Sequence, residues 1–598
     1  MLAAVVLFVC AAFCSCSNIS VQDFGPNDLS NILDVIINDG EYIPETTDPD
    51  DFVEPSETSE TPTEPPTTTK PEQSTTENPA NPDGTTDSTD STEPPTTTEA
   101  PTEPPTEEPD DEPVVTVIDI RKVFPGAPEK FWHVDFPESV RMTDSLKRNI
   151  KNLADFSTKD FGGEPFYIVT TDATLFTPLY SGGMLSDARR YRTEIVDAQC
   201  NIITESVEKP KSVIFDYIKT NILADDTGTG IILCLPFDIQ SDLIRNNLVM
   251  SLKKVPFLNF KAGYYNASAT EAFSINGNIL GLVSDMTFDP STIYSVYYNK
   301  SLVKEYNLTD PLSLYKDNKW DYDGMFAIAK EFTSASASLN GEDSEEPGNS
   351  AEVLPKWAIG FEWANSDNII SGMFTASGGK YFSQNNNSAG FPVIDFDDNK
   401  ARGIINAAKK IFLPSSDPES DMNNYLGNAE QQRAAFTGGN VLFSFSKLDM
   451  IPDITTSDFD WGLLPVPGLN GENAKFSFAD GNAMSVSVPK NSRNTEVGGL
   501  MISAMSMTSH EQLKDIYVLE QMTYNLRDVD SVNVLNEIVN NIAFSPYNAY
   551  YTIPEIANAT GGLLNNAANG KGEFEALYEK SRNSLETFFS SSEIFAGR

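Results

Sequence analysis

Residues 166–237 contain three short apolar runs, FYIVTT (166–171), CNIITESV (200–207) and GIILCLPF (230–237). Two segments whose apolar residues recur at helical spacing, 184–199 and 213–224, separate these runs. The third run is apolar at consecutive positions, which indicates a strand buried on both faces of a sheet. A β-α-β-α-β order at this short spacing predicts a parallel sheet with crossover helices, and in such sheets ligands bind beyond the carboxyl ends of the strands.

The alternation of strands and helices continues to the end of the chain. Further strands are expected over 276–283, 293–298, 441–445, 461–464 and 483–488. Helices are expected over 300–306, 321–332, 399–412 and 429–436, and the chain is mostly helical from Val497 onward. A chain of 598 residues is too long for one hydrophobic core, so an α/β protein with at least two units is expected.

The charge of the chain is concentrated in one segment. The whole chain has 87 acidic and 41 basic side chains and a formal charge of -46. Residues 17–113 hold 26 of the acidic side chains and a single cation, Lys70, so this segment contributes -25. Its second part, residues 44–113, contains 19 Thr and 16 Pro. Such a composition cannot bury enough apolar surface to fold, so residues 17–113 are expected to form a disordered, extended tether.

The first sixteen residues have the pattern of an export signal. Leu2–Phe13 is an apolar run that is too short to span a bilayer and typical of a signal-peptide core. Cys10 near the end of this run clusters with Cys14 and Cys16, and Cys16 stands after the small Ser15. This arrangement resembles a bacterial lipoprotein signal, in which the cysteine is lipidated and becomes the mature N-terminus. An ordinary cleaved signal peptide is the alternative, and the sequence leaves open which of the three cysteines carries lipid.

Several classes of function find no support in the residues. The excess of carboxylates argues against a nucleic-acid partner. His133 and His510 are the only histidines, so a histidine-based catalytic triad or a zinc site with several histidine ligands is not expected. We predict no catalytic residue, metal or cofactor. A glycosidase needs only two carboxylates, so this class stays open. Whether Cys200 and Cys234 form a disulfide also stays open.

Several motifs then occur in a fixed order. They are Tyr297-Tyr-Asn-Lys300, Trp320-Asp321 before a helix, Gly378-Gly379, Gly438–Phe443, Trp461–Pro467 and Gly481–Pro489. In this order the chain resembles the sugar-type, maltose-binding-protein-like extracellular solute-binding proteins of ABC importers. The resemblance covers about residue 166 to the end, and residues 114–164 fall outside it.

The resemblance implies an α/β, two-lobed, periplasmic-binding-protein-like fold with a hinge and an interlobe cleft. After the signal peptide (1–16) and the tether (17–113), residues 114–598 would form the solute-binding domain. Lobe 1 would comprise about 114–285 and 480–535, and lobe 2 about 286–479 and 536–598. The lobes would close on a sugar and deliver it to the transmembrane permease subunits. An N-terminal lipid would hold the chain on the outer face of the cytoplasmic membrane, as in Gram-positive bacteria.

The resemblance also implies which residues contact the ligand. By position they are Thr171, Asp172, Phe237, Asp238, Asp285, Trp363, Asp367, Asn368, Ser446, Lys447 and Asp480. Trp363 is the best candidate for stacking on a sugar ring, and a core tryptophan is the competing interpretation. Members of the family often have a stacking tryptophan where this chain has Ser446-Lys447-Leu448. A binding protein on the cell surface without a permease, and a carbohydrate hydrolase, are the alternative functions.

Overall fold

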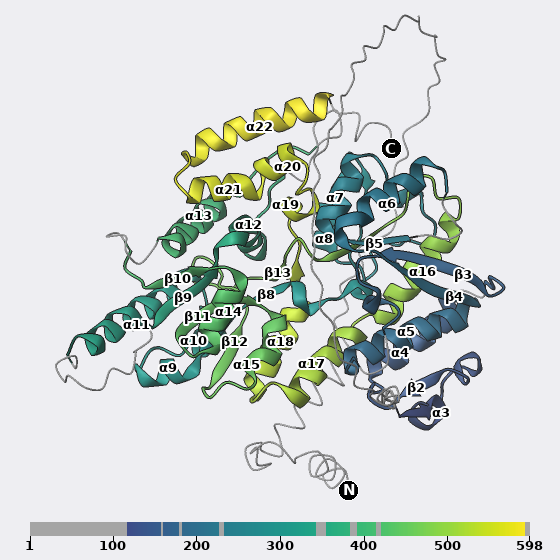
Figure 1. Cartoon of the computed structure of the whole chain (residues 1–598), viewed down its shortest axis with the longest axis horizontal. Helices are drawn as coiled ribbons and strands as arrows, with labels where there is room; N and C mark the ends of the chain where they lie inside the picture. The colour runs from purple at the N-terminus through teal and green to yellow at the C-terminus, as the bar shows by residue number, and fades with distance from the viewer. Residues whose placement is uncertain are drawn as a thin grey trace, which may run out of the picture. The chain divides into compact units, whose positions relative to one another are not determined.

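The computed structural model describes residues 116–156, 159–178, 182–226, 232–342, 355–382, 392–413 and 420–591. The expected signal peptide, the expected tether and Cys16 lie outside these ranges. The described residues form two α/β lobes, each built on its own sheet (Figure 1). None of the helices in the described ranges is both long enough and apolar enough to cross a membrane.

The sheet of lobe 1 has the strand order β14-β5-β3-β4. Its strands are β3 (Glu164–Thr170), β4 (Ile202–Glu208), β5 (Ile232–Pro236) and β14 (Met484–Ser487). The first three are parallel, and β14 joins β5 antiparallel. The helices of this lobe are α4 (Asp144–Phe156), α5 (Met184–Cys200), α6 (Lys211–Leu223), α7 (Phe237–Arg245), α8 (Ala267–Ala272), α16 (Thr495–Ser509) and α17 (Gln512–Tyr524). The three predicted strands and the two helices between them are confirmed.

Strand β5 shows why the apolar run at 230–237 has no polar positions. Ile232 and Cys234 face a core that includes α5 and α16, whereas Leu233 and Leu235 face a core that includes α6 and α7. Helices therefore cover both faces of the sheet, as a continuously apolar strand requires. The thiols of Cys200 and Cys234 are both buried and free.

The sheet of lobe 2 has the order β10-β9-β11-β8-β13-β15, with β12 paired to β8. Its strands are β8 (Ile293–Asn299), β9 (Trp357–Glu362), β10 (Asn424–Gly427), β11 (Val441–Lys447), β12 (Trp461–Leu464), β13 (Ser477–Ala479) and β15 (Ile542–Ala543). Strands β9, β10 and β11 are parallel to one another, and β8 runs antiparallel to β11, β12 and β13. The ends of β9, β11 and β13 therefore meet the start of β8 at one edge of the sheet.

Helices of lobe 2 carry most of the remaining chain. They are α9 (Lys300–Glu305), α10 (Pro311–Lys316), α11 (Tyr322–Glu342), α12 (Ser366–Ala376), α13 (Asp398–Phe412), α14 (Ala429–Thr437), α15 (Ile451–Ile454), α18 (Val529–Asn540), α19 (Pro546–Ala549), α20 (Pro554–Ala559), α21 (Gly561–Ala568) and α22 (Phe574–Ser591). Trp320 and Trp461 are buried in this lobe. At the other end of the chain, β1 (Val117–Asp119) and β2 (Asp135–Pro137) pair as a hairpin around α3 (Ile120–Val123).

One predicted strand is wrong. Residues 276–283 were expected to be extended, but β6 (Ser274–Ile275) and β7 (Asn278–Ile279) form a small hairpin instead. Asn276 and Gly277 make its turn with φ of 49° and 70°. Positive φ at both central positions is what a tight hairpin turn of this kind needs, and Asn-Gly is the preferred pair for it.

Three chain crossings connect the lobes. The first passes from Val283 through the short 3-10 helix Asp285–Thr287 to β8, the second passes from β13 through Asp480 to β14, and the third passes from α17 to α18. The first two crossings lie side by side, because the Asp480 amide donates to the Thr292 carbonyl at 2.9 Å. Any rotation of one lobe against the other must therefore act on the crossing segments.

Asp285 fixes the first crossing to lobe 1. Its carboxylate accepts from His510 Nδ1 at 2.8 Å and from the Glu511 amide at 3.2 Å, and it pairs with Lys514 Nζ at 2.8 Å. Burial raises the pKa of Asp285, but Lys514 and His510 outweigh burial, so the pKa lies below its ordinary value. The carboxylate is thus held ionised between the crossing and the start of α17.

We expect Asp285→Asn to destabilise the chain by about 3–5 kcal/mol, because it leaves the Lys514 ammonium without its buried counter-ion. Urea unfolding at neutral pH measures this loss. Because the folded pKa is depressed, the stabilisation exists above the carboxyl pKa of the unfolded chain and disappears as the pH falls through the folded pKa. The difference between the two proteins should therefore shrink in acid.

Asp317→Asn is the matched control. Asp317 pairs with Lys319 at 3.4 Å, with side chains 65% and 63% exposed. An exposed pair of this kind contributes less than about 1 kcal/mol. Equal losses in Asp285→Asn and Asp317→Asn would show that Asp285 does not anchor the crossing.

Candidate functional site

Polar side chains collect where the second crossing meets the carboxyl ends of both sheets. Asp480 is 2% exposed, and its carboxylate accepts from the Asn482 amide at 2.9 Å and from Asn482 Nδ2 at 3.2 Å. Lys447, at the end of β11, reaches the same carboxylate at 3.1 Å. Asp480 is therefore held from both sides by groups that belong to different lobes.

Asn482 extends this contact into lobe 1. Its Oδ1 accepts from Lys211 Nζ at 3.1 Å, and Lys211 also pairs with Asp238 at 2.7 Å. Lys211 opens α6 after β4, and Asp238 lies in the first turn of α7 after β5. Both side chains are thus placed by the carboxyl ends of parallel strands, as the fold class predicts.

Glu362 extends the contact into lobe 2. It ends β9, is 7% exposed, and accepts from Tyr294 Oη at 3.0 Å and from Asn365 Nδ2 at 2.6 Å. We call the set Asp238, Lys211, Asn482, Asp480, Lys447 and Glu362 the crossing network.

Electrostatics hold Lys447 in its charged form. Burial lowers the pKa of Lys447, but Asp480, Asp449 and Glu362 more than compensate, so its pKa lies above the ordinary value. Burial raises the pKa of Tyr294 well above its ordinary value, so its hydroxyl stays a donor. The network therefore combines two ammonium groups and the Asn482 amide as donors with three carboxylate acceptors, and the Tyr294 phenol donates to one of these, Glu362. In the described part of the chain, no group of three or more His, Cys, Asp or Glu side chains is arranged to hold a metal ion.

Trp363 stands at the edge of this network, directly after Glu362. Its side chain is 43% exposed, and its ring meets Phe412 edge-on, at 5.0 Å between ring centroids and 81° between planes. Trp363 is therefore not a core tryptophan, and part of its ring is accessible to a ligand.

The other predicted contacts are spread more widely. Thr171 lies near the second crossing, with its hydroxyl 3.9 Å from Met484 Sδ. Asp172 caps the turn that follows β3 by accepting from Thr174. Phe237 is fully buried against the rings of Phe273 and Phe544.

On lobe 2, Asn368 Oδ1 is buried without a hydrogen-bond partner among the described residues and lies close to Gly481. Ser446 is buried, with its hydroxyl 3.1 Å from that of Ser444. Asp285, by contrast, belongs to the lobe 1 anchor with His510 and Lys514.

Asp367 belongs to a second polar group on α12. It accepts from Tyr547 Oη at 3.2 Å and from Asn565 Nδ2, and burial raises its pKa. The exposed Tyr551 packs edge-on against Tyr547 at 5.6 Å. Tyr547 and Tyr551 were not predicted from the sequence, because Tyr547 lies in the short helix α19 and Tyr551 in the turn after it, far along the chain.

The structure also brings in Glu362, Tyr294, Asn365, Lys211 and Asn482, which the sequence analysis missed. Glu362 could have been found, because it is the charged residue that ends the apolar run WAIGFE (357–362). Lys211 and Asn482 had no local signal, since only the pairing of β14 with β5 brings them together.

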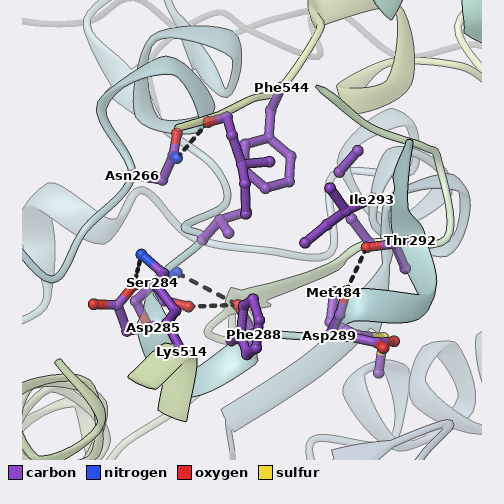
Figure 2. A pocket seen from close by; sticks show the side chains of 15 residues that line it. Asn266, Ser284, Asp285, Phe288, Asp289, Thr292, Ile293, Met484, Lys514 and Phe544 are labelled. Atoms are coloured by element: carbon purple, nitrogen blue, oxygen red, sulfur yellow. Dashed lines mark hydrogen bonds and ion pairs between the residues drawn. The ribbon is translucent and has the colours of Figure 1, made fainter. Parts of the chain in front are cut away.

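Two cavities flank the crossings. The hinge cavity has a volume of about 40 Å³ and lies between the crossings, lined by Thr292, Ile293, Ala479 and Met484 among others (Figure 2). Figure 2 shows Asp285 and Lys514 together on one side of it and Asp289 and Met484 on another. This volume has room for water, which needs about 10–15 Å³, but not for a sugar ring.

The reverse cavity has a volume of about 460 Å³. It is lined by Glu271 and Gly277 of lobe 1 and by Lys380, Tyr381 and Phe476 of lobe 2, among others. Phe476 precedes β13, whereas Asp480 follows it. The reverse cavity therefore opens on the side of the sheet opposite to the crossing network.

Comparison with known proteins finds a family model that matches part of the chain. Residues 239–505 match the model of the family described as bacterial extracellular solute-binding protein. No curated protein matches the sequence.

Solved structures similar to this chain include three binding proteins. The GacH receptor of Streptomyces glaucescens, solved unliganded and with acarbose, is 12% identical with a TM-score of 0.44 over 72% of this chain and 100% of its own. The cyclic α-maltosyl-1,6-maltose binding protein of Arthrobacter globiformis is 12% identical with a TM-score of 0.46 over the same shares. An ABC substrate-binding protein of Listeria monocytogenes, in complex with cycloalternan, is 13% identical with a TM-score of 0.43 over the same shares.

Residues 239–505, which lie within two α/β lobes joined by adjacent crossings, are thus the part of this chain that is similar to the bacterial extracellular solute-binding proteins.

Proposed function

We propose that this chain captures a carbohydrate outside the cell and delivers it to the permease subunits of an ABC importer. The observation that supports the proposal most is the crossing network, which joins polar side chains of both lobes at the carboxyl ends of their strands. Sugar hydroxyls both donate and accept hydrogen bonds, so a site for them needs ammonium, amide and carboxylate groups close together. The network has all three.

The exposed ring of Trp363 supports a carbohydrate over other polar solutes. The C–H face of a sugar ring packs on an aromatic face, and Trp363 offers one next to Glu362. Carboxylates outnumber ammonium groups in the crossing network by three to two, so the site favours a neutral sugar over an acidic one.

Binding would occur by closure of the lobes about the crossings. A solute that hydrogen-bonds Asp238 or Lys211 on lobe 1 and Glu362 or Lys447 on lobe 2 stabilises the closed arrangement, because it contacts both lobes only there. The closed form would then be the one that the permease recognises.

The proposal also covers the location of the chain. The family is extracellular, and the N-terminal pattern at Cys16 would attach the chain by a lipid to the outer face of the membrane, with residues 17–113 as the tether. Intact-mass measurement of the membrane fraction tests the anchor: a diacylglyceryl adduct on the mature chain supports it, and an unmodified cleaved chain removes it.

A thermal-shift panel of neutral mono- and oligosaccharides tests the ligand class. A solute that binds only the folded chain stabilises it by mass action, by about 2.7 kcal/mol at a concentration one hundred times its Kd. This stabilisation raises the melting temperature. We expect a concentration-dependent rise with at least one neutral saccharide and none with amino acids or peptides. A rise with the amino acids or peptides alone would overturn the carbohydrate assignment.

Trp363→Ala tests the stacking role. We expect it to weaken the affinity for the saccharide at least tenfold, about 1.4 kcal/mol, because a tryptophan against a ligand is a typical hot spot. Isothermal titration calorimetry gives the affinity.

The matched control is Trp132→Ala. Trp132 has nearly the same exposure, 42% against 43%, but lies in the N-terminal segment outside the crossing network. Its removal should leave the affinity unchanged. If Trp363→Ala bound as tightly as Trp132→Ala, the ring would play no part in ligand recognition.

A further inference from the structure

The loop from Ser251 to Lys261 differs in charge from the rest of the chain. Between Asp242 and Glu271 there is no carboxylate, although acidic residues outnumber basic ones two to one overall. The same stretch contains four cations: Arg245, Lys253, Lys254 and Lys261. We call residues 251–261 the basic loop.

The lysines of the basic loop are exposed and available. Lys253, Lys254 and Lys261 all lie on the surface. None of the ion pairs formed among the described residues involves any of the three. Glu496 of α16, the helix that contacts the loop, is already paired with Lys159 at 2.5 Å.

An aromatic ring is displayed among these lysines. Phe257 is 44% exposed, and its φ of 66° lies in the left-handed region, which is costly for a bulky residue. Its ring meets the edge of Phe156, at 6.4 Å between centroids and 67° between planes. Leu258 and Phe260 beside it are half-buried.

Contacts with α16 hold this backbone in place. Ser503 Oγ donates to the Phe257 carbonyl at 2.7 Å. The loop also approaches α16 so closely that a Cβ at Gly499 would lie 1.9 Å from the Pro256 carbonyl oxygen. Contacts with α16 thus hold Phe257 at its unfavourable φ. In this conformation the Phe257 ring is exposed in a loop whose lysines form no ion pair among the described residues.

We propose that the basic loop is a docking surface for an anionic membrane. Lysine side chains are attracted to an anionic leaflet, and an aromatic ring inserts between the headgroups. The ring is presented on a turn, not in a groove that would fit a protein side chain, and this favours a lipid surface over an acidic protein. The proposal concerns a different face from the solute site and does not depend on the solute.

The attraction would be local. The chain as a whole is acidic, and a bilayer of the same sign repels it at long range. At 0.15 M salt the Debye length is about 8 Å, so the loop acts only when it is close to the leaflet. A tether of the expected kind would bring it there, and the loop would then orient lobe 1 toward the bilayer.

Co-sedimentation of the full chain with vesicles tests this proposal at 0.1 M salt. The vesicles are equimolar phosphatidylglycerol and phosphatidylcholine, or phosphatidylcholine alone. We expect preferential binding to the anionic vesicles, and a loss of at least tenfold in Lys253→Glu/Lys254→Glu. The apolar N-terminal run contributes equally to every variant, so differences between variants report on the loop.

Two further variants sharpen the test. Lys304→Glu/Lys409→Glu makes the same change in net charge at exposed lysines of lobe 2 and should bind as the unchanged chain does. Phe257→Gly should keep or raise the melting temperature, since glycine tolerates the positive φ, while it weakens vesicle binding several-fold.

Equal binding to both kinds of vesicle would overturn the proposal. So would equal losses in the two double charge reversals, or unchanged binding in Phe257→Gly. Binding to soluble polyglutamate but not to vesicles, abolished by Lys253→Glu/Lys254→Glu, would show that the loop serves an acidic protein and not a membrane.

Discussion

The contact on which the site depends is the one between Lys447 and Asp480. The two groups lie 3.1 Å apart, and Asp480 is 2% exposed on the segment that joins the lobes. A buried carboxylate is tolerated only when it is paired and hydrogen-bonded. Lys447 and Asn482 meet this requirement, and in doing so they fix the end of β11, the end of β13 and the start of β14 relative to one another.

The first two crossings are stabilised in different ways, and the difference has a functional meaning. The first is fixed to lobe 1 by Asp285, which His510 and Lys514 hold in a separate buried cluster. The second carries Asp480 and Asn482, whose partners lie on both lobes. Of these two, the second can therefore respond to a solute that contacts both lobes, while the first is fixed to lobe 1.

The sequence alone predicted the parallel sheet of lobe 1. The run GIILCLPF (230–237) is apolar at consecutive positions, as a strand that packs against a core on each face of the sheet requires. The family resemblance named Asp238, Lys447 and Asp480 as expected ligand contacts, and the structure brings all three into the crossing network. The sequence could not predict Lys211 or Asn482, whose meeting depends on β14 returning to lobe 1 from far along the chain. Asp285 lies in the anchor of lobe 1, and Phe237 in the core, because a position after a strand does not determine which way a side chain points. The strand expected at 276–283 was wrong, because the Asn276-Gly277 pair at its start forms the turn of a hairpin and the apolar residues after it do not continue as one strand.

A structure of the chain with a saccharide found by the thermal-shift panel tests the central claim most directly. The account predicts the sugar at the crossing network, with hydrogen bonds to side chains of both lobes and a ring against Trp363. A sugar seated in the reverse cavity, beside Lys380, Tyr381 and Phe476, with the crossing network free of ligand, would contradict it.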